Sequence, residues 1–181
     1  WLEALPDSTI RAHGDLSGYK AWLLYLRGRI EEAEAYSAPA HTTEHADIPP
    51  THQATLLAFQ AFLAINRGNP EKAAVLARQA LNELRESESF FHTCALSLLG
   101  HAQRLSGDRK TAVETLSQAV RLSQKLGNHL ITLDALGNLA PLMYAQGRLR
   151  EAMLLCCENV ERYVDVRGKS LAVAGLVYVP L

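Results

Sequence analysis

Two short phrases of the sequence carry residue types that could do chemistry. His41, Glu44 and His45 have the HxxEH spacing with which one class of zinc peptidase holds its metal and its general base. That chemistry needs both histidines on one helix face and a third protein ligand. Here the phrase runs into a linker that ends at Pro50, and no third ligand is suitably spaced. We expect incidental metal binding at most, and no metal catalysis.

The second phrase imitates a phosphate-binding loop. Gly168, Lys169 and Ser170 match the end of the GxxxxGK[ST] motif, in which backbone N–H groups and a lysine hold nucleotide phosphates. The first glycine of that motif would fall at Tyr163, and no strand pattern precedes it. The match is attributed to chance, and we expect neither a cofactor nor enzymatic activity in this chain.

The three cysteines, Cys94, Cys156 and Cys157, indicate neither a disulfide framework nor a zinc site. Their odd number and the lack of a CxxC spacing argue against both. We expect reduced thiols and a cytoplasmic protein, with Cys156 and Cys157 buried in the packing of an apolar helix.

Composition and charge exclude several classes of protein. The chain has 181 residues, 48% hydrophobic and 20% charged, as in an ordered globular domain. Its formal charge of -1 gives no electrostatic basis for binding nucleic acid or an anionic membrane. The longest apolar run, 171–181, is shorter than the roughly 20 residues of a membrane helix, and the short acidic start of the chain leads us to expect no signal peptide.

Four glycines recur at a nearly constant spacing. Gly28, Gly68, Gly107 and Gly147 are separated by 40, 39 and 40 residues, and an alanine follows each glycine five residues later. These alanines are Ala33, Ala73, Ala112 and Ala152. Glycine ends a helix readily because it adopts the left-handed conformation without steric cost. A small alanine lets a second helix pack closely on the first, so the pattern predicts a series of helical hairpins.

Apolar residues at helical spacing place a helix on each side of every turn. We predict helix pairs at 14–27/29–40, 50–67/70–86, 88–106/108–126 and 129–146/148–165. Pro70 fits the first turn of its helix, and Asp108 is the expected N-cap of another. A preceding repeat is expected to end near Pro6, and 168–181 to open a fifth pair. We expect residues 1–181 to form a single repeat domain that is a fragment of a larger protein.

The third repeat resembles the tetratricopeptide consensus. The matching positions are Leu99, Gly100, Gly107, Asp108, Ala112, Leu116 and Ala119. The period near 40 exceeds the usual length of about 34 residues, and the proline that ends each consensus repeat is absent. The resemblance implies an all-α fold, a right-handed superhelix of about four to five αα-hairpin repeats.

Three longer phrases, at 1–6, 136–140 and 145–152, are similar to one family in particular. They resemble the repeat region of large ATP-dependent LuxR-type transcription activators of the maltose-regulon type. In that family the region lies between a nucleotide-binding switch and a helix-turn-helix, and it takes up an inducer or a regulatory protein. The resemblance implies signal sensing by this chain, whereas ATP and DNA binding would belong to neighbouring domains.

The repeat register implies which side chains line the concave groove of such a superhelix. In the first two repeats they are Tyr19, Trp22, Tyr25, Phe59, Phe62 and Asn66. In the next two they are Ser97, His101, Arg104, Asp134, Asn138 and Tyr144. Aromatic rings with a few hydrogen-bonding groups suit a sugar, a small amphipathic effector or a peptide. Aromatic residues at helical spacing also build cores, so Trp22, Tyr25 and Phe62 stay open between packing and binding.

Two further features bear on the groove. His101 and Arg104, one helical turn apart on a short polar face, are the strongest candidates for ligand contact. Pro141 lies within a predicted helix, where it removes a backbone hydrogen bond and is expected to kink the axis.

Two hypotheses for function follow. The first is a non-catalytic domain of a LuxR-type regulator whose groove senses a small-molecule effector or a regulatory protein. The alternative is a scaffold or adaptor that binds a peptide segment of a partner. Because both ends of the fragment are expected to expose apolar repeat faces, self-association through these ends is a further expectation.

Overall fold

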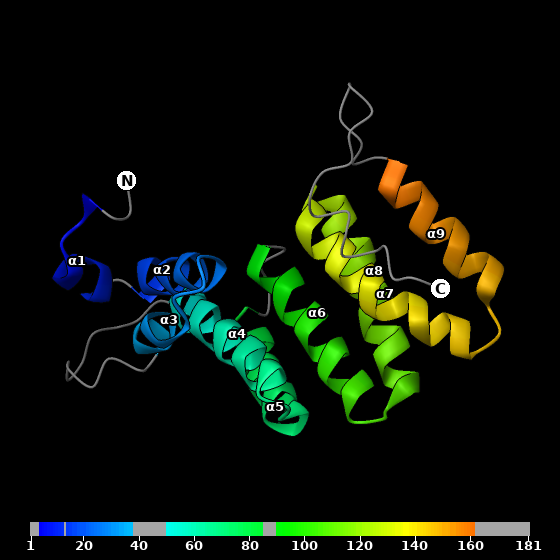
Figure 1. Ribbon diagram of the computed structural model, residues 1–181, viewed down its shortest axis with the longest axis horizontal. Coiled ribbons are helices and arrows are strands. Elements are labelled where there is room, and N and C mark those ends of the chain that lie inside the picture. Colours follow the sequence, from blue (N-terminus) through cyan, green and yellow to red (C-terminus); the bar gives the residue numbers. More distant parts are fainter. Residues whose placement is uncertain (1–3, 13, 38–49, 85–89, 162–181) are drawn as a thin grey trace. The chain divides into compact units, whose positions relative to one another are not determined.

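The computed structural model describes residues 4–12, 14–37, 50–84 and 90–161. Within these ranges the chain forms nine α-helices that follow one another as hairpins (Figure 1). Their bounds are α1 Asp7–Ala12, α2 Gly14–Leu26, α3 Ile30–Ser37, α4 Pro50–Asn66, α5 Pro70–Glu83, α6 Phe90–Leu105, α7 Arg109–Lys125, α8 His129–Ala145 and α9 Leu149–Glu161. The predicted all-α, tetratricopeptide-like hairpin fold is confirmed.

The chain divides into two compact units, Trp1–Ser87 and Glu88–Leu181. The first unit contains the hairpins α2/α3 and α4/α5, and the second contains α6/α7 and α8/α9. In all four, the helices begin and end within four residues of the predicted bounds. The predicted fifth pair lies outside the described residues.

The turn of each hairpin is built around its glycine. In the third hairpin, the N–H of Gly107 donates to the carbonyl of Arg104 at 3.2 Å, and the N–H of Asp108 to that of Gln103 at 3.0 Å. These two bonds satisfy carbonyls at the end of α6, and they require a left-handed residue at the glycine position. The φ of Gly107 is +86°, and the other three turn glycines lie between +72° and +76°.

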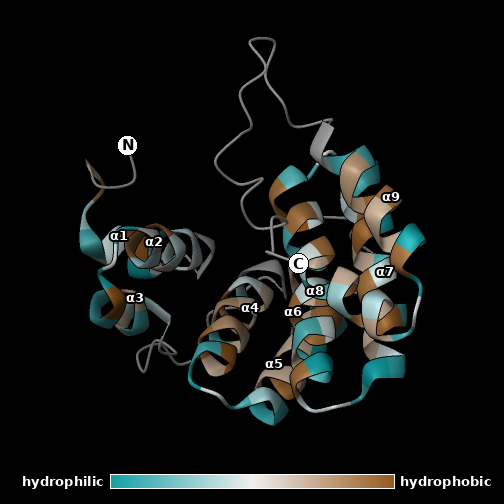
Figure 2. Cartoon of the chain, turned by 45° about the vertical axis from the view of Figure 1, so that its right-hand side comes forward, coloured by the Kyte–Doolittle hydropathy of each residue, from teal (hydrophilic) through white to brown (hydrophobic). Residues whose placement is uncertain are grey.

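Capping groups fix where the second helices begin. Oδ1 of Asp108 accepts from the backbone N–H of Thr111 at 3.2 Å, so the predicted N-cap of α7 is confirmed. In α5, Asn69 is the cap, and Pro70 occupies the first turn as predicted. Hydrophilic residues accordingly gather at the helix ends and turns (Figure 2).

Pro6 lies directly before a helix. Helix α1 begins directly after this residue, and the N–H groups of Thr9 and Ile10 donate to the Pro6 carbonyl at 3.0 and 3.2 Å. A proline at a helix start loses no hydrogen bond, because the first N–H groups of a helix have no partner within it. Pro6 therefore precedes α1, and the residues before Ala4 that would show the end of a preceding repeat lie outside the described residues.

Helix α8 contains Pro141 and continues beyond it to Ala145. The proline is exposed, so its ring lies at the surface of the second unit. Because proline has no N–H, the carbonyl four residues earlier, that of Gly137, lacks its helical partner. None of the described helices is long and apolar enough to cross a membrane.

Small residues bring paired helices into close contact. The alanines five residues after the turn glycines are all buried: Ala33, Ala73 and Ala112 are 0% exposed and Ala152 is 6% exposed. The closest approach in the third hairpin is at Gly100 of α6, where an added Cβ would lie 2.5 Å from Cγ of Leu116 on α7. Leu116 is fully buried, so it has little room to move.

We expect Gly100→Ala to destabilise the chain by about 1–3 kcal/mol, because its methyl group overlaps Leu116. Urea denaturation measures this change. In a Leu116→Ala background the overlap is gone, and alanine should then stabilise α6 by up to about 1 kcal/mol through its helix propensity. An equal cost of Gly100→Ala in both backgrounds would show that contact with Leu116 is not the reason for the glycine.

Candidate functional site

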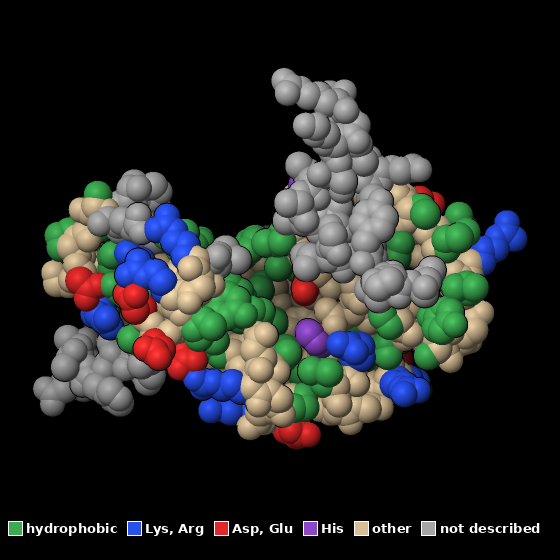
Figure 3. Space-filling view, in the orientation of Figure 1, with side chains coloured by type: hydrophobic (Ala, Val, Ile, Leu, Met, Phe, Trp, Pro, Cys, Tyr) green, Lys and Arg blue, Asp and Glu red, His purple; other side chains and the backbone are tan. Residues whose placement is uncertain are grey.

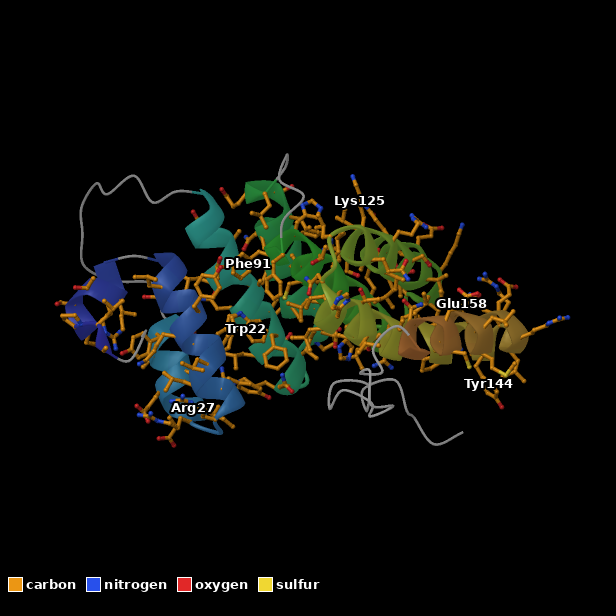
Figure 4. The ribbon with its side chains drawn as sticks, turned by 90° about the horizontal axis from the view of Figure 1, so that it is seen from above. Trp22, Arg27, Phe91, Lys125, Tyr144 and Glu158 are labelled. Carbon is orange, nitrogen blue, oxygen red and sulfur yellow. The ribbon has the colours of Figure 1, made fainter. Side chains whose placement is uncertain are left out.

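Four rings, called here the aromatic cluster, join α2 to α4 in the first unit. They are Trp22, Tyr25, Phe59 and Phe62. The centroids of Trp22 and Phe62 are 4.9 Å apart, and those of Tyr25 and Phe62 are 4.7 Å apart with perpendicular planes. Figure 4 shows Trp22 between these two helices. The cluster packs on the core of the unit and holds its two hairpins together.

Phe59 corrects one prediction for the groove. Its side chain is 0% exposed and belongs to the core with Leu24 and Leu63, so it is not accessible to a ligand. Trp22, Tyr25 and Phe62 are half-buried against this core, which gives each a packing role.

The remaining aromatic and amide candidates lie at the surface. Tyr19 is 49% exposed and Tyr144 is 58% exposed. Asn66 is also exposed, and its Nδ2 donates to the carbonyl of Phe62 in the preceding turn. No hydrogen bond joins Tyr144 to another candidate among the described residues. Tyr19 and Asn66 belong to the first unit, and Tyr144 belongs to the second.

Five polar candidates do come together in the second unit, where they connect α6 to α8. This polar seam consists of Ser97, His101, Arg104, Asp134 and Asn138. Oγ of Ser97 donates to Oδ2 of Asp134 at 2.6 Å, and Nε of Arg104 donates to Oδ1 of Asn138 at 3.2 Å. Nδ2 of Asn138 donates in turn to the backbone carbonyl of Asp134 at 3.0 Å. Asn138 is thus held by both of its amide atoms and orients the Arg104 guanidinium.

Counting back from the turn glycines shows that the cluster and the seam use equivalent positions. Tyr25 and Arg104 each lie three residues before the glycine of their repeat. Their partners Phe59 and Asn138 each lie nine residues before the glycine of the following repeat. An edge-to-face ring contact in the first unit is therefore replaced by a hydrogen bond in the second.

A second pair of positions obeys the same rule. Gly18 and Ser97 lie ten residues before their glycines, and Thr55 and Asp134 thirteen residues before the next ones. A Cβ added to Gly18 would overlap the methyl group of Thr55, so the two helices touch there. In the second unit the same place holds the Ser97–Asp134 hydrogen bond.

Burial makes the seam electrostatically unusual. Desolvation lowers the pKa of His101 to about 4, with a smaller contribution from the nearby Arg104 charge, so its imidazole is neutral at pH 7. Desolvation also raises the pKa of Asp134, an effect that the hydrogen bond from Ser97 partly opposes. On the face drawn in Figure 3, a histidine lies beside a basic side chain, and an acidic side chain lies just above it.

Cys94 is a buried residue close enough to Asp134 of the seam to interact with its charge. It is 4% exposed, and burial raises the pKa of its thiol to about 12, with a smaller contribution from Asp134. Cys94 was not predicted as part of the site, although it lies thirteen residues before Gly107, the position that Asp134 holds in its own repeat. The thiol is therefore protonated and acts as a small packing group.

Comparison with known protein families identifies the chain. The model of the MalT-like TPR region matches residues 54–180, and a tetratricopeptide repeat model matches residues 19–35. The chain belongs to the MalT-like TPR family. No solved structure matches it. The resemblance inferred from the repeat phrases is confirmed at the level of this family, a repeat region of MalT-family regulators.

Within this MalT-like region, the cysteines of α9 differ from the prediction. Cys156 is half-buried, where burial raises the pKa of its thiol, but Cys157 is exposed. Leu154 and Met153 on the same helix are also about half exposed, at 48% and 56%. An apolar stretch of sequence did not ensure burial here, because α9 presents part of it to solvent.

The two motifs considered first cannot be placed. Residues 41–45 and 168–170 both lie outside the described residues. Among the residues that the structure does describe, no group of three or more His, Cys, Asp or Glu side chains could hold a metal ion.

The lowered pKa of His101 predicts a pH dependence of stability. In the unfolded chain, His101 binds a proton below its usual pKa of about 6.5. In the folded chain, the same imidazole binds a proton only when the pH falls to about 4. The free energy of unfolding should therefore fall as the pH decreases between these values. Since His101 is only half-buried, we expect a loss of about 1–2 kcal/mol after solvent screening.

Urea denaturation of the wild type and His101→Gln at pH 7, 6, 5 and 4 isolates this contribution, because Asp134 is common to both chains. The free energy of unfolding of the wild type, minus that of His101→Gln, should decrease steadily as the pH falls. Arg121→Gln, exposed on α7, is the control for an exchange at the surface and should keep the pH profile of the wild type. A His101→Gln chain with the same pH profile as the wild type would refute the assignment.

Proposed function

We propose that this MalT-like TPR region binds a regulatory ligand through the polar seam and thereby serves as the sensing domain of a LuxR-type transcription regulator. The observation that carries the proposal is the state of Arg104. Its guanidinium is half-buried and oriented by Asn138 through Nε. Within the described residues, no hydrogen bond or ion pair occupies its two terminal nitrogens. A desolvated, oriented cation with free donors is suited to binding a ligand.

His101 strengthens this arrangement. It lies six residues before Gly107, the position that Trp22 holds in the first repeat, and no hydrogen bond to a described residue restrains its ring. A neutral imidazole offers one donor and one acceptor. Together with Arg104 it provides hydrogen-bonding groups for a sugar, a small effector or a peptide, the ligand classes that suit the groove.

The position of the seam suggests how binding is transmitted. Because the seam joins the first helices of consecutive repeats, a ligand held between α6 and α8 favours one angle between them over others. Repeats contact mainly their neighbours, so a change of angle at one junction alters the curvature of the whole array. The ligand then shifts the regulator toward whichever state binds it better.

The proposal also covers the context of the chain. Tetratricopeptide repeat regions are typically non-catalytic and bind proteins or ligands, and we propose binding without chemistry here. We further propose that residues 1–181 are one repeat domain of a larger cytoplasmic regulator, in which ATP and DNA bind to neighbouring domains.

A thermal-shift screen of the full chain against sugars, small metabolites and peptides tests the proposal. A ligand at 100 times its Kd should stabilise the fold by about 2.7 kcal/mol. His101→Ala and Arg104→Ala should abolish this stabilisation. Arg121→Ala, exposed on α7, is the matched control and should retain it. A ligand that stabilises the wild type and both seam variants equally would bind elsewhere, and the proposal would be wrong.

A further inference from the structure

We propose that the polar seam binds a dipolar ligand, a short peptide of two or three residues or a chain of similar length, with its ammonium group at Asp134 and its carboxylate at Arg104. This inference rests on the proposed function and names the chemical class of ligand that the seam would take.

No cation of the described residues is paired with the acidic end of the seam. Oδ2 of Asp134 accepts from the hydroxyl of Ser97 at 2.6 Å, and no other described residue donates a hydrogen bond to this carboxylate. One neutral hydroxyl compensates little of the cost of desolvating a carboxylate. An ammonium group on a ligand would neutralise Asp134 and donate to its second oxygen.

At the basic end of the seam, no anion from the part of the chain that the structure describes is paired with Arg104. Arg104 donates through Nε to the neutral amide of Asn138, which leaves the planar pair Nη1 and Nη2 directed away from that bond. This pair matches the two oxygens of a carboxylate in a bidentate contact. The neutral imidazole of His101, one helical turn away, can donate a further hydrogen bond.

The two charges of the seam do not neutralise each other. No ion pair joins Arg104 to Asp134 among the described residues, and each is instead hydrogen-bonded to a neutral group. A purely anionic ligand would leave Asp134 without a cation, and a purely cationic ligand would leave Arg104 without an anion. Only a ligand with both charges satisfies both ends, and this favours a dipolar molecule over a singly charged one.

Helix geometry sets the length of such a ligand. Ser97 and Arg104 are seven residues apart on α6, about 10 Å along the axis, and Asp134 and Asn138 are four apart on α8, about 6 Å. The two charged ends are therefore about 6–10 Å apart. An extended peptide spans about 3.3–3.6 Å per residue, so two or three residues separate an N-terminal ammonium from a C-terminal carboxylate by this distance.

Isothermal titration of the full chain with alanine peptides tests the inference. We expect dialanine or trialanine to bind more tightly than pentaalanine or free alanine. N-acetylation or C-amidation of trialanine should each weaken binding by about tenfold, since each removes one charged contact. Acetylation should have little further effect on Asp134→Asn, and amidation little further effect on Arg104→Gln.

Both variants keep a group that can form the existing contacts with Ser97 and Asn138, and thermal melts check that they fold. Arg121→Gln is the matched control and should respond to capping as the wild type does. Equal binding of the free and capped peptides would overturn the inference. If no peptide binds while a sugar or metabolite stabilises the chain through His101 and Arg104, the inference fails and the proposed function stands. If nothing binds through the seam, both fail.

Discussion

The left-handed glycine that ends the first helix of each hairpin is the constraint on which the rest of the structure depends. At Gly107 it closes two backbone hydrogen bonds, ends α6 and allows Asp108 to cap α7 within one residue. The number of residues between a side chain and the following glycine then determines its position along the helix axis and the helix face on which it lies. This is why residues three before one glycine meet residues nine before the next, in both units of the chain.

At equivalent repeat positions, the first unit has aromatic side chains and the second unit has polar or charged ones. The aromatic cluster buries apolar rings around Phe59 and contributes stability to the first unit. The polar seam holds a half-buried carboxylate and a half-buried guanidinium without pairing them, and desolvation of these groups costs stability. Proteins commonly accept such a cost at binding sites, where a ligand supplies the missing partners. The contrast between equivalent positions therefore supports the proposal that the second unit binds the ligand.

The glycine spacing predicted the helices, the turns and the cap at Asp108, because these depend on local backbone chemistry. The groove residues were predicted only as members of one helix face, and the face alone does not determine how deeply a side chain is buried. Phe59 lies in the core, whereas Tyr144 lies at the surface. The pairing of Ser97 with Asp134 depends on how consecutive repeats are offset, which a periodic sequence alone does not specify. Cys157 is exposed because burial depends on what packs against α9, not on the residue type.

The energetics of switching favour a site that spans two repeats. Reversing a two-state equilibrium from 1:99 to 99:1 requires a ligand to prefer one state by about 5.5 kcal/mol. A single hydrogen bond to a charged group supplies only about 1.5–3 kcal/mol. Two charged contacts, one to Asp134 on α8 and one to Arg104 on α6, reach the required range together, and only while both helices hold the distance that the ligand spans. In the proposed mechanism each contact is lost when that distance changes, so the discrimination between states would arise from the seam itself, without a separate moving part.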